Sequence, residues 1–216
     1  MSIPRPKVDK GITLLEARIG VRKGFIRRLL KEDDWSFVIK LHAVFEAVCT
    51  HLLLFHFKEP ELSEVFSRLE LSNKATGKVA FLSKLELLDN ENRRFISVLS
   101  ELRNSLVHDV RNAEFSLTSL ATTKEPEQIK QLAISFSPYD TLIRKFPYDP
   151  KMKLGFGPVE QKHASIAQVV ERFKTNPKVH IWAGGYNVLI SLVDMYGYSE
   201  YRQWAKSNPS TFHDAL

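Results

Sequence analysis

The feature that most constrains the fold is an apolar run, residues 35–57, that has no polar face. When its residues are placed at helical intervals, apolar side chains fall on nearly every side, which is typical of a helix surrounded by other helices. Asp33 and Asp34 precede the run, and short acidic side chains favour the first turn of a helix. The rest of the chain must therefore supply enough helices to cover a central one.

Helical spacing of apolar residues also occurs before and after this run, in residues 12–31, 79–88 and 90–111. Pro60 suits the first turn of a short helix that ends near Leu69. No segment shows a strong alternating strand pattern. The sequence therefore predicts an all-α fold, in which four or five helices with short connections form an antiparallel bundle.

The pattern is weaker after Asn112. Residues 117–126 are predicted to form a loop, and the prolines and glycines of residues 138–158 predict an irregular crossing segment. We expect a bundle domain over residues 1–112 and a C-terminal helical region over residues 113–216 that packs on it, with a single domain as the alternative. Helices of that region are predicted at residues 125–137, 160–174, 178–196 and 199–206.

Composition indicates a soluble protein, with 44% hydrophobic and 26% charged residues. The single cysteine, Cys49, has no partner for an internal disulfide, which agrees with a reducing compartment. The N-terminus has no apolar signal-peptide core. The longest apolar stretch, residues 43–57, contains a glutamate and two histidines and is predicted to be too short to span a membrane. We expect a cytoplasmic protein with no membrane contact.

Positive charge is concentrated near the N-terminus. Residues 1–31 carry nine basic and two acidic residues, a net charge of +7, whereas the whole chain carries +6. Such a concentration attracts a polyanion, although a solvated helix face is the plain alternative. The segment predicts contact with a polyanion such as a nucleic acid through Arg22, Lys23, Arg27 and Arg28.

The predicted helix at 90–111 carries the residues with the clearest chemistry. A guanidinium at Arg103, a carboxamide at Asn104 and an imidazole at His108 could together hold a phosphodiester and move its protons without a metal. Arg103 is predicted to project from an apolar side of the helix. A charge is costly there without a partner, which predicts that another helix or another subunit covers this side. One narrow stripe of the same helix is predicted to face the core: Phe95, Leu99, Leu102 and Leu106.

This segment, ELRNSLVHD at residues 101–109, resembles the signature of HEPN domains, which is an arginine, a polar residue that is often asparagine, a spacer and a histidine. The resemblance covers roughly residues 33–112 and includes a similarity to mannitol-repressor-like proteins. It implies a homodimeric endoribonuclease that needs no metal or cofactor and leaves a cyclic phosphate and a 5′-hydroxyl. By the same resemblance, His108 would move the proton and Arg103 would hold the phosphorane. Asn104 would orient the phosphate or the His108 ring, and the basic N-terminal segment would steer RNA to the cleft.

The resemblance also implies a toxin or phage-defence effector with an antitoxin or regulatory partner protein. In toxins controlled by nucleotide transfer, a tyrosine stands two residues after the histidine. Val110 occupies that position here, which argues against that form of control.

Two other functions fit the same residues. In a non-catalytic HEPN regulator or adaptor, Arg103 would pair with a buried carboxylate such as Glu46, and His108 would lie at a helix C-terminus. In a nucleic-acid binder without cleavage, the basic segment would act alone. The remaining candidates are predicted to be structural: His42, His51, His56, Trp182 and Tyr186 as core or interface residues, and Gly184 and Gly185 as sites of close helix approach.

Overall fold

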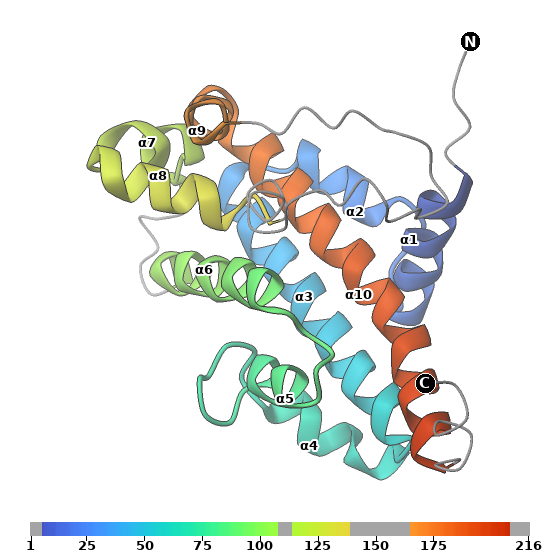
Figure 1. The fold of residues 1–216 in the computed structure, drawn as a ribbon. Helices are drawn as coiled ribbons and strands as arrows, with labels where there is room; N and C mark the ends of the chain where they lie inside the picture. Colours follow the sequence, from blue (N-terminus) through green and yellow to red (C-terminus); the bar gives the residue numbers. More distant parts are fainter. Residues whose placement is uncertain (1–5, 108–113, 139–164, 208–216) are drawn as a thin grey trace, which may run out of the picture.

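The computed structural model describes residues 6–107, 114–138 and 165–207. Every regular element in these ranges is helical, so the predicted all-α class is confirmed, whereas the HEPN arrangement stays a prediction (Figure 1). The helices are α1 (Pro6–Arg18), α2 (Phe25–Arg28), α3 (Asp34–Phe57), α4 (Ser63–Arg68), α5 (Lys78–Lys84), α6 (Asn90–Val107), α7 (Leu117–Thr123), α8 (Pro126–Ser135), α9 (Ile166–Thr175) and α10 (Pro177–Ser207), with 3₁₀ turns η1 (Leu29–Lys31) and η2 (Pro60–Leu62).

The central helix is α3, as its uniform apolarity predicts. It packs against α10, α6, α5 and α4, and it begins after Asp33, whose side chain accepts a hydrogen bond from the Ser36 amide at 2.8 Å. Residues 43–57 are predicted to be too short to span a membrane. The whole of α3 is longer, and by length and composition it could cross one. Of its most apolar window, 56% is buried inside the protein, and the core helix of a soluble protein passes the same test.

The predicted basic helix over residues 12–31 is wrong, because the chain breaks between α1 and α2. Gly20 and Gly24 have φ angles of 75° and 78°, in the left-handed region that glycine tolerates best. The carboxylate of Glu16, only 2% exposed, accepts hydrogen bonds from the amides of Gly24 at 2.6 Å and Ile26 at 2.9 Å. This buried side chain therefore fastens the start of α2 to the end of α1.

Residues 117–126, predicted as a loop, contain helix α7 instead. Ser116 caps α7 by accepting a hydrogen bond from the Ser119 amide at 3.3 Å. The Asp34 carboxylate, at the start of α3, accepts another from the Leu117 amide at 2.8 Å. Leu117 and Ala121 are fully buried, so burial and a long-range cap stabilise a helix whose local signal is weak.

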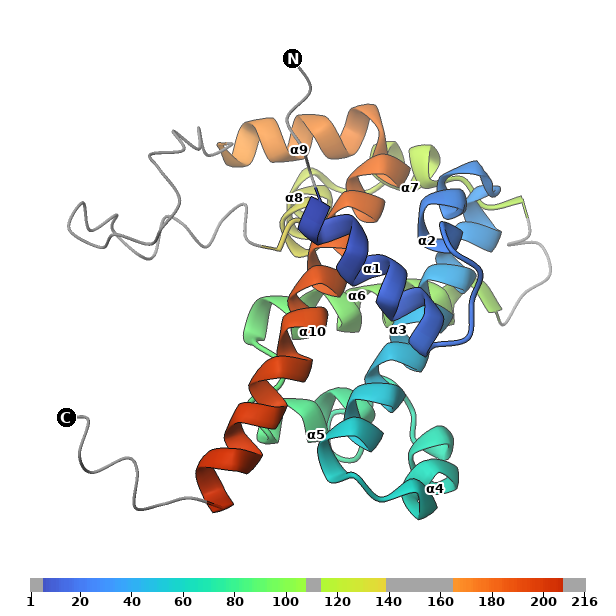
Figure 2. The same cartoon turned by 90° about the vertical axis from the view of Figure 1, so that its right-hand side faces the viewer.

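The last helix, α10, is continuous over 31 residues and replaces the two helices predicted at 178–196 and 199–206. Contacts with α3 on both sides of Gly197 keep α10 helical through this glycine. The Tyr196 hydroxyl lies 3.0 Å from Nδ1 of His51, and the Ser199 hydroxyl lies 2.8 Å from Nδ1 of His56. In both cartoon views α10 runs beside α3 (Figures 1 and 2).

One hydrophobic core joins the described helices on both sides of residue 112. It includes buried residues from α1, α3, α6, α8 and α10, so the C-terminal helices complete the core rather than extend from it. The division at residue 112 stays a prediction. Most of the predicted crossing segment, including Pro147, Pro150 and Pro158, lies outside the described residues.

Candidate functional site at the α3–α6 contact

Arg103 and Asn104 lie near the end of α6, and their positions follow from its amphipathic pattern. The predicted stripe from Phe95 to Leu106 is buried, so α6 packs one side into the core and leaves Asn104 exposed and Arg103 half-buried. Arg103 Nη1 donates a hydrogen bond to Asn104 Oδ1 at 3.1 Å. The third residue of the motif, His108, lies outside the described residues, so its place beside Arg103 stays a prediction.

An imidazole that the motif does not include lies close to Arg103. His42 projects from α3, is 8% exposed, and interacts electrostatically with Arg103, Lys78 and Glu46. Burial is the main cause that lowers the pKa of His42, Glu46 raises it, and the two cations lower it further. A lowered pKa keeps the ring neutral at neutral pH, so His42 can accept a proton there.

The carboxylate beside these groups does not pair with Arg103. Lys78, on α5 and only 1% exposed, places its Nζ 2.9 Å from Glu46 Oε1. The pairing of Arg103 with Glu46, proposed for an adaptor, is therefore contradicted. Within the described ranges, the side-chain hydrogen bond of Arg103 is the one to Asn104, and no ion pair includes it. Its guanidinium keeps donors that an anion could take.

The indole of Trp35 ties the two helices together near the motif. Its Nε1 donates a hydrogen bond to the carbonyl oxygen of Leu106 at 3.4 Å, which joins the start of α3 to the last turn of α6. This contact limits how far the end of α6 can move from α3. It therefore supports a fixed position for Arg103 and Asn104 relative to His42.

The other two histidines of α3 have structural partners, as predicted. His56 is buried against Ser199, and half-buried His51 contacts Tyr196. Burial and the nearby Arg18 guanidinium lower the pKa of His51. Among the residues that the structure describes, no group of three or more His, Cys, Asp or Glu side chains is placed to hold a metal ion.

We expect the free energy of unfolding to fall as the pH drops below about 6.5. His42 and His51 have lowered pKa values in the folded protein, so below 6.5 the unfolded chain binds more protons and acid favours it. Thermal unfolding of the wild type and a His42→Gln/His51→Gln variant between pH 8 and pH 5 measures this. The loss on acidification should be smaller in the variant; equal losses would contradict the assignment.

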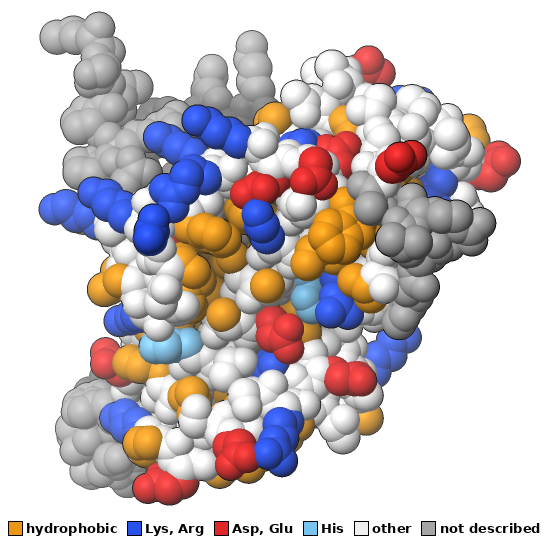
Figure 3. Space-filling model, turned by 180° about the vertical axis from the view of Figure 1, so that it is seen from behind, with side chains coloured by type: hydrophobic (Ala, Val, Ile, Leu, Met, Phe, Trp, Pro, Cys, Tyr) orange, Lys and Arg blue, Asp and Glu red, His pale blue; other side chains and the backbone are white. Residues whose placement is uncertain are grey.

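The four predicted RNA-binding residues lie together at the surface. Arg22 and Lys23 occupy the turn before α2, Arg27 and Arg28 lie within α2, and all four are exposed. Arg28 donates hydrogen bonds to the carbonyl oxygens of Lys23 at 2.8 Å and Arg22 at 3.4 Å, which fixes the turn. In Figure 3, Lys and Arg side chains gather at the upper left, where α1 and α2 lie.

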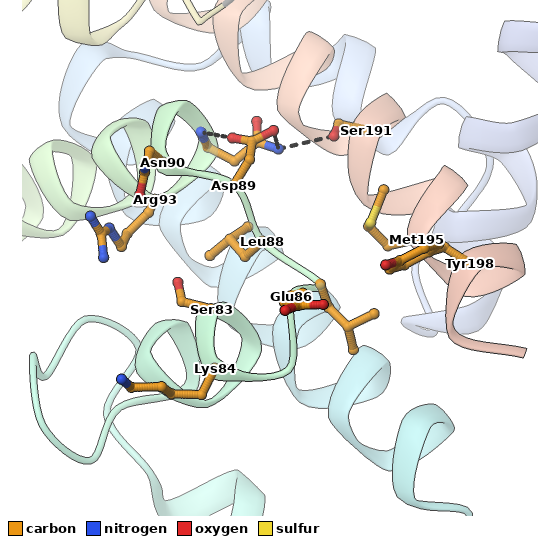
Figure 4. Close-up of a pocket in the computed structure, with 12 residues that line it drawn as sticks. Ser83, Lys84, Glu86, Leu88, Asp89, Asn90, Arg93, Ser191, Met195 and Tyr198 are labelled. Atoms are coloured by element: carbon orange, nitrogen blue, oxygen red, sulfur yellow. Dashed lines mark hydrogen bonds between the residues drawn. The ribbon is translucent and has the colours of Figure 1, made fainter. Parts of the chain in front are cut away.

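A separate pocket of about 580 Å³ lies between the α5–α6 turn and α10, away from Arg103 (Figure 4). Asp89 and Ser191, on its two sides, are bridged by the amide nitrogen of Asn92, at 3.2 Å and 2.9 Å respectively. These polar groups satisfy one another, so they join α6 to α10. The lining contains neither Arg103 nor His42, and we assign this pocket no part in the candidate site.

Comparison of the chain with protein-family models, with curated proteins and with solved structures found no match in any of the three. The resemblance to HEPN domains therefore depends on the residues of the motif and on the helical pattern around it. The geometry adds the half-buried Arg103, its contact with Asn104, and the neutral imidazole of His42 beside them.

Proposed function

We propose that this protein is a metal-independent endoribonuclease of the HEPN type, with Arg103 as the residue that binds the scissile phosphate. The observation that carries the proposal is that the Arg103 guanidinium makes no ion pair with a described residue. It is partly exposed, it interacts electrostatically with His42 of α3, and within the described residues it has no carboxylate partner. A phosphate group of RNA would supply the missing negative charge.

The chemistry needs only groups of the protein and the RNA. The ribose 2′-oxygen attacks the adjacent phosphorus and its proton passes to a base, while the bond from phosphorus to the 5′-oxygen breaks. The departing oxygen takes a proton from an acid, which leaves a 2′,3′-cyclic phosphate and a 5′-hydroxyl. Arg103 would stabilise the negative charge that grows on the phosphorane oxygens, and Asn104 would orient the phosphate.

An imidazole is suited to both proton transfers. His42 is proposed as the base because its ring is unprotonated at neutral pH and interacts electrostatically with Arg103. His108 remains the proposed second proton carrier. We further propose that two copies of the chain meet at the end of α6, where Asn104 and Val107 are exposed, so that each contributes an Arg103 to a shared cleft.

The adaptor hypothesis loses its main structural support. It placed Arg103 in an architectural ion pair with a buried carboxylate such as Glu46, whereas Lys78 is the residue that pairs with Glu46. Binding of RNA without cleavage is a further competing function, because the exposed basic residues before and within α2 serve either function.

We expect the pure protein to cut a single-stranded RNA in the presence of EDTA and to leave intact a DNA of the same sequence. The DNA lacks the attacking 2′-hydroxyl, so it is the matched control. Mass spectrometry of the fragments should find a 2′,3′-cyclic phosphate on one end and a hydroxyl on the other. Cleavage of the DNA, a 3′-hydroxyl end, or no cleavage of RNA at equimolar protein would overturn the proposal.

A further inference from the structure

A groove of about 900 Å³ lies between α1, the start of α2 and the first half of α10. In Figure 2, α1 passes in front of α10, and α2 lies beside α1. The groove does not include Arg103 or Asn104, so it is separate from the site described above. Its lining combines an aromatic pair from α10 with basic residues from α1 and α2.

The aromatic pair is formed by Trp182 and Tyr186, four residues apart on α10. Their ring centroids are 5.0 Å apart and their planes are inclined by 26°, a stacked arrangement. Trp182 Nε1 donates a hydrogen bond to the carbonyl oxygen of Ile26 at 2.8 Å, which fixes the indole against α2. Both residues are only partly buried and line the groove, so an anchored aromatic pair forms part of its wall.

The walls of the groove are positively charged. Lys10 of α1, Lys23 of the turn and Arg27 of α2 line it, and all three are exposed. The acidic residue of the lining, Glu16, is 2% exposed and uses both carboxylate oxygens to accept the amides of Gly24 and Ile26. An anion in the groove would therefore meet cations that Glu16 does not neutralise through direct contact.

We propose that this groove binds single-stranded RNA, with one unpaired base stacked on the Trp182–Tyr186 pair and its flanking phosphates near Lys10, Lys23 and Arg27. A flat ring system and a line of cations are the two features that bind single strands without a sequence code. A base inside a duplex has no free face to stack, so the groove selects unpaired segments. The choice of RNA over DNA rests on the proposed function.

The test uses the full chain and a labelled 2′-O-methyl oligouridine of about 12 nucleotides, which cannot be cleaved through its 2′ position. Fluorescence anisotropy compares the wild type with Tyr186→Leu and Tyr186→Phe. We expect Tyr186→Leu to weaken binding by about tenfold and Tyr186→Phe to retain it, because only leucine removes the ring. The same oligouridine annealed to its complement should bind more weakly than the single strand.

A second pair of variants tests the charges and does not disturb the aromatic pair. Lys23→Ala/Arg27→Ala should make the salt dependence weaker, reducing the magnitude of the slope of log affinity against log salt by about 1.4. The control Lys74→Ala/Lys124→Ala, at exposed sites elsewhere, should leave the slope unchanged. Equal effects of the two double variants, or equal affinity for single strand and duplex, would overturn the groove assignment.

The groove and the proposed cleavage can fail separately. Loss of binding in Tyr186→Leu together with no RNA cleavage by the wild type would support the groove and remove the ribonuclease. Cleavage by the wild type with unchanged binding in Tyr186→Leu would support the ribonuclease and remove the groove.

Discussion

Replacing Gly184 by alanine is expected to lower the free energy of unfolding by about 3 kcal/mol or more. A Cβ atom at this position would lie 2.0 Å from the carbonyl oxygen and 3.0 Å from the carbonyl carbon of Phe136. These are backbone atoms at the end of α8 and cannot rotate away. The Phe136 ring is itself buried between Phe95 and Phe173, with centroids 5.4 Å and 6.3 Å away, so α8 and α10 would have to separate.

Two other glycines of α10 provide matched controls in the same helix. At Gly185 a Cβ would meet a ring atom of Phe95 at 3.2 Å and no backbone atom, so we expect a smaller loss of about 1 kcal/mol. At Gly197 it would meet nothing within 4 Å, and alanine should stabilise the helix by about 0.5–1 kcal/mol. Denaturant unfolding of the three alanine variants measures their free energies of unfolding. Equal stability of Gly184→Ala and Gly197→Ala would contradict the predicted order.

The helices predicted best are those whose burial pattern is strong within one segment. α3 is apolar on all sides and α6 carries one clear stripe, so both could be found from residues near one another in sequence. The errors occur where a distant group decides the local structure. Glu16 holds the start of α2, the Asp34 carboxylate binds the Leu117 amide of α7, and contacts with α3 carry α10 through Gly197.

The candidate site also has residues that the local sequence reveals and residues that only the tertiary structure reveals. Arg103 and Asn104 were found because they are adjacent on one amphipathic helix. His42 is predicted as a core or interface residue and is buried, but nothing local in the sequence indicates that α3 presents it to Arg103. A weak signal existed in the four-residue spacing of His42 and Glu46, which puts an imidazole and a carboxylate on one side of an otherwise apolar helix. Tyr186 and Trp182 share that spacing, but their basic neighbours come from the other end of the chain.

Replacing Arg103 by alanine is expected to slow RNA cleavage by at least about 100-fold and to change the thermal midpoint little. The rate falls because the phosphorane loses the cation that stabilises it. Stability changes little because, within the described residues, Arg103 donates one side-chain hydrogen bond, to the exposed Asn104. Arg103→Lys should recover only part of the rate, since an ammonium cannot bind two phosphate oxygens in the planar geometry of a guanidinium.

Arg94 supplies the matched control for this variant. It lies on the same helix, is 42% exposed and pairs with Glu91 at 3.1 Å, so Arg94→Ala removes an equal charge from α6 away from the motif. Cleavage should persist in Arg94→Ala and slow by at least about 100-fold in Arg103→Ala, with circular dichroism showing both variants folded. A large fall in the thermal midpoint of Arg103→Ala, with cleavage reduced only in proportion to the unfolded fraction, would instead make Arg103 an architectural residue. In that case the half-buried guanidinium would stabilise the α3–α6 contact, and the phosphate of RNA would have to be bound elsewhere.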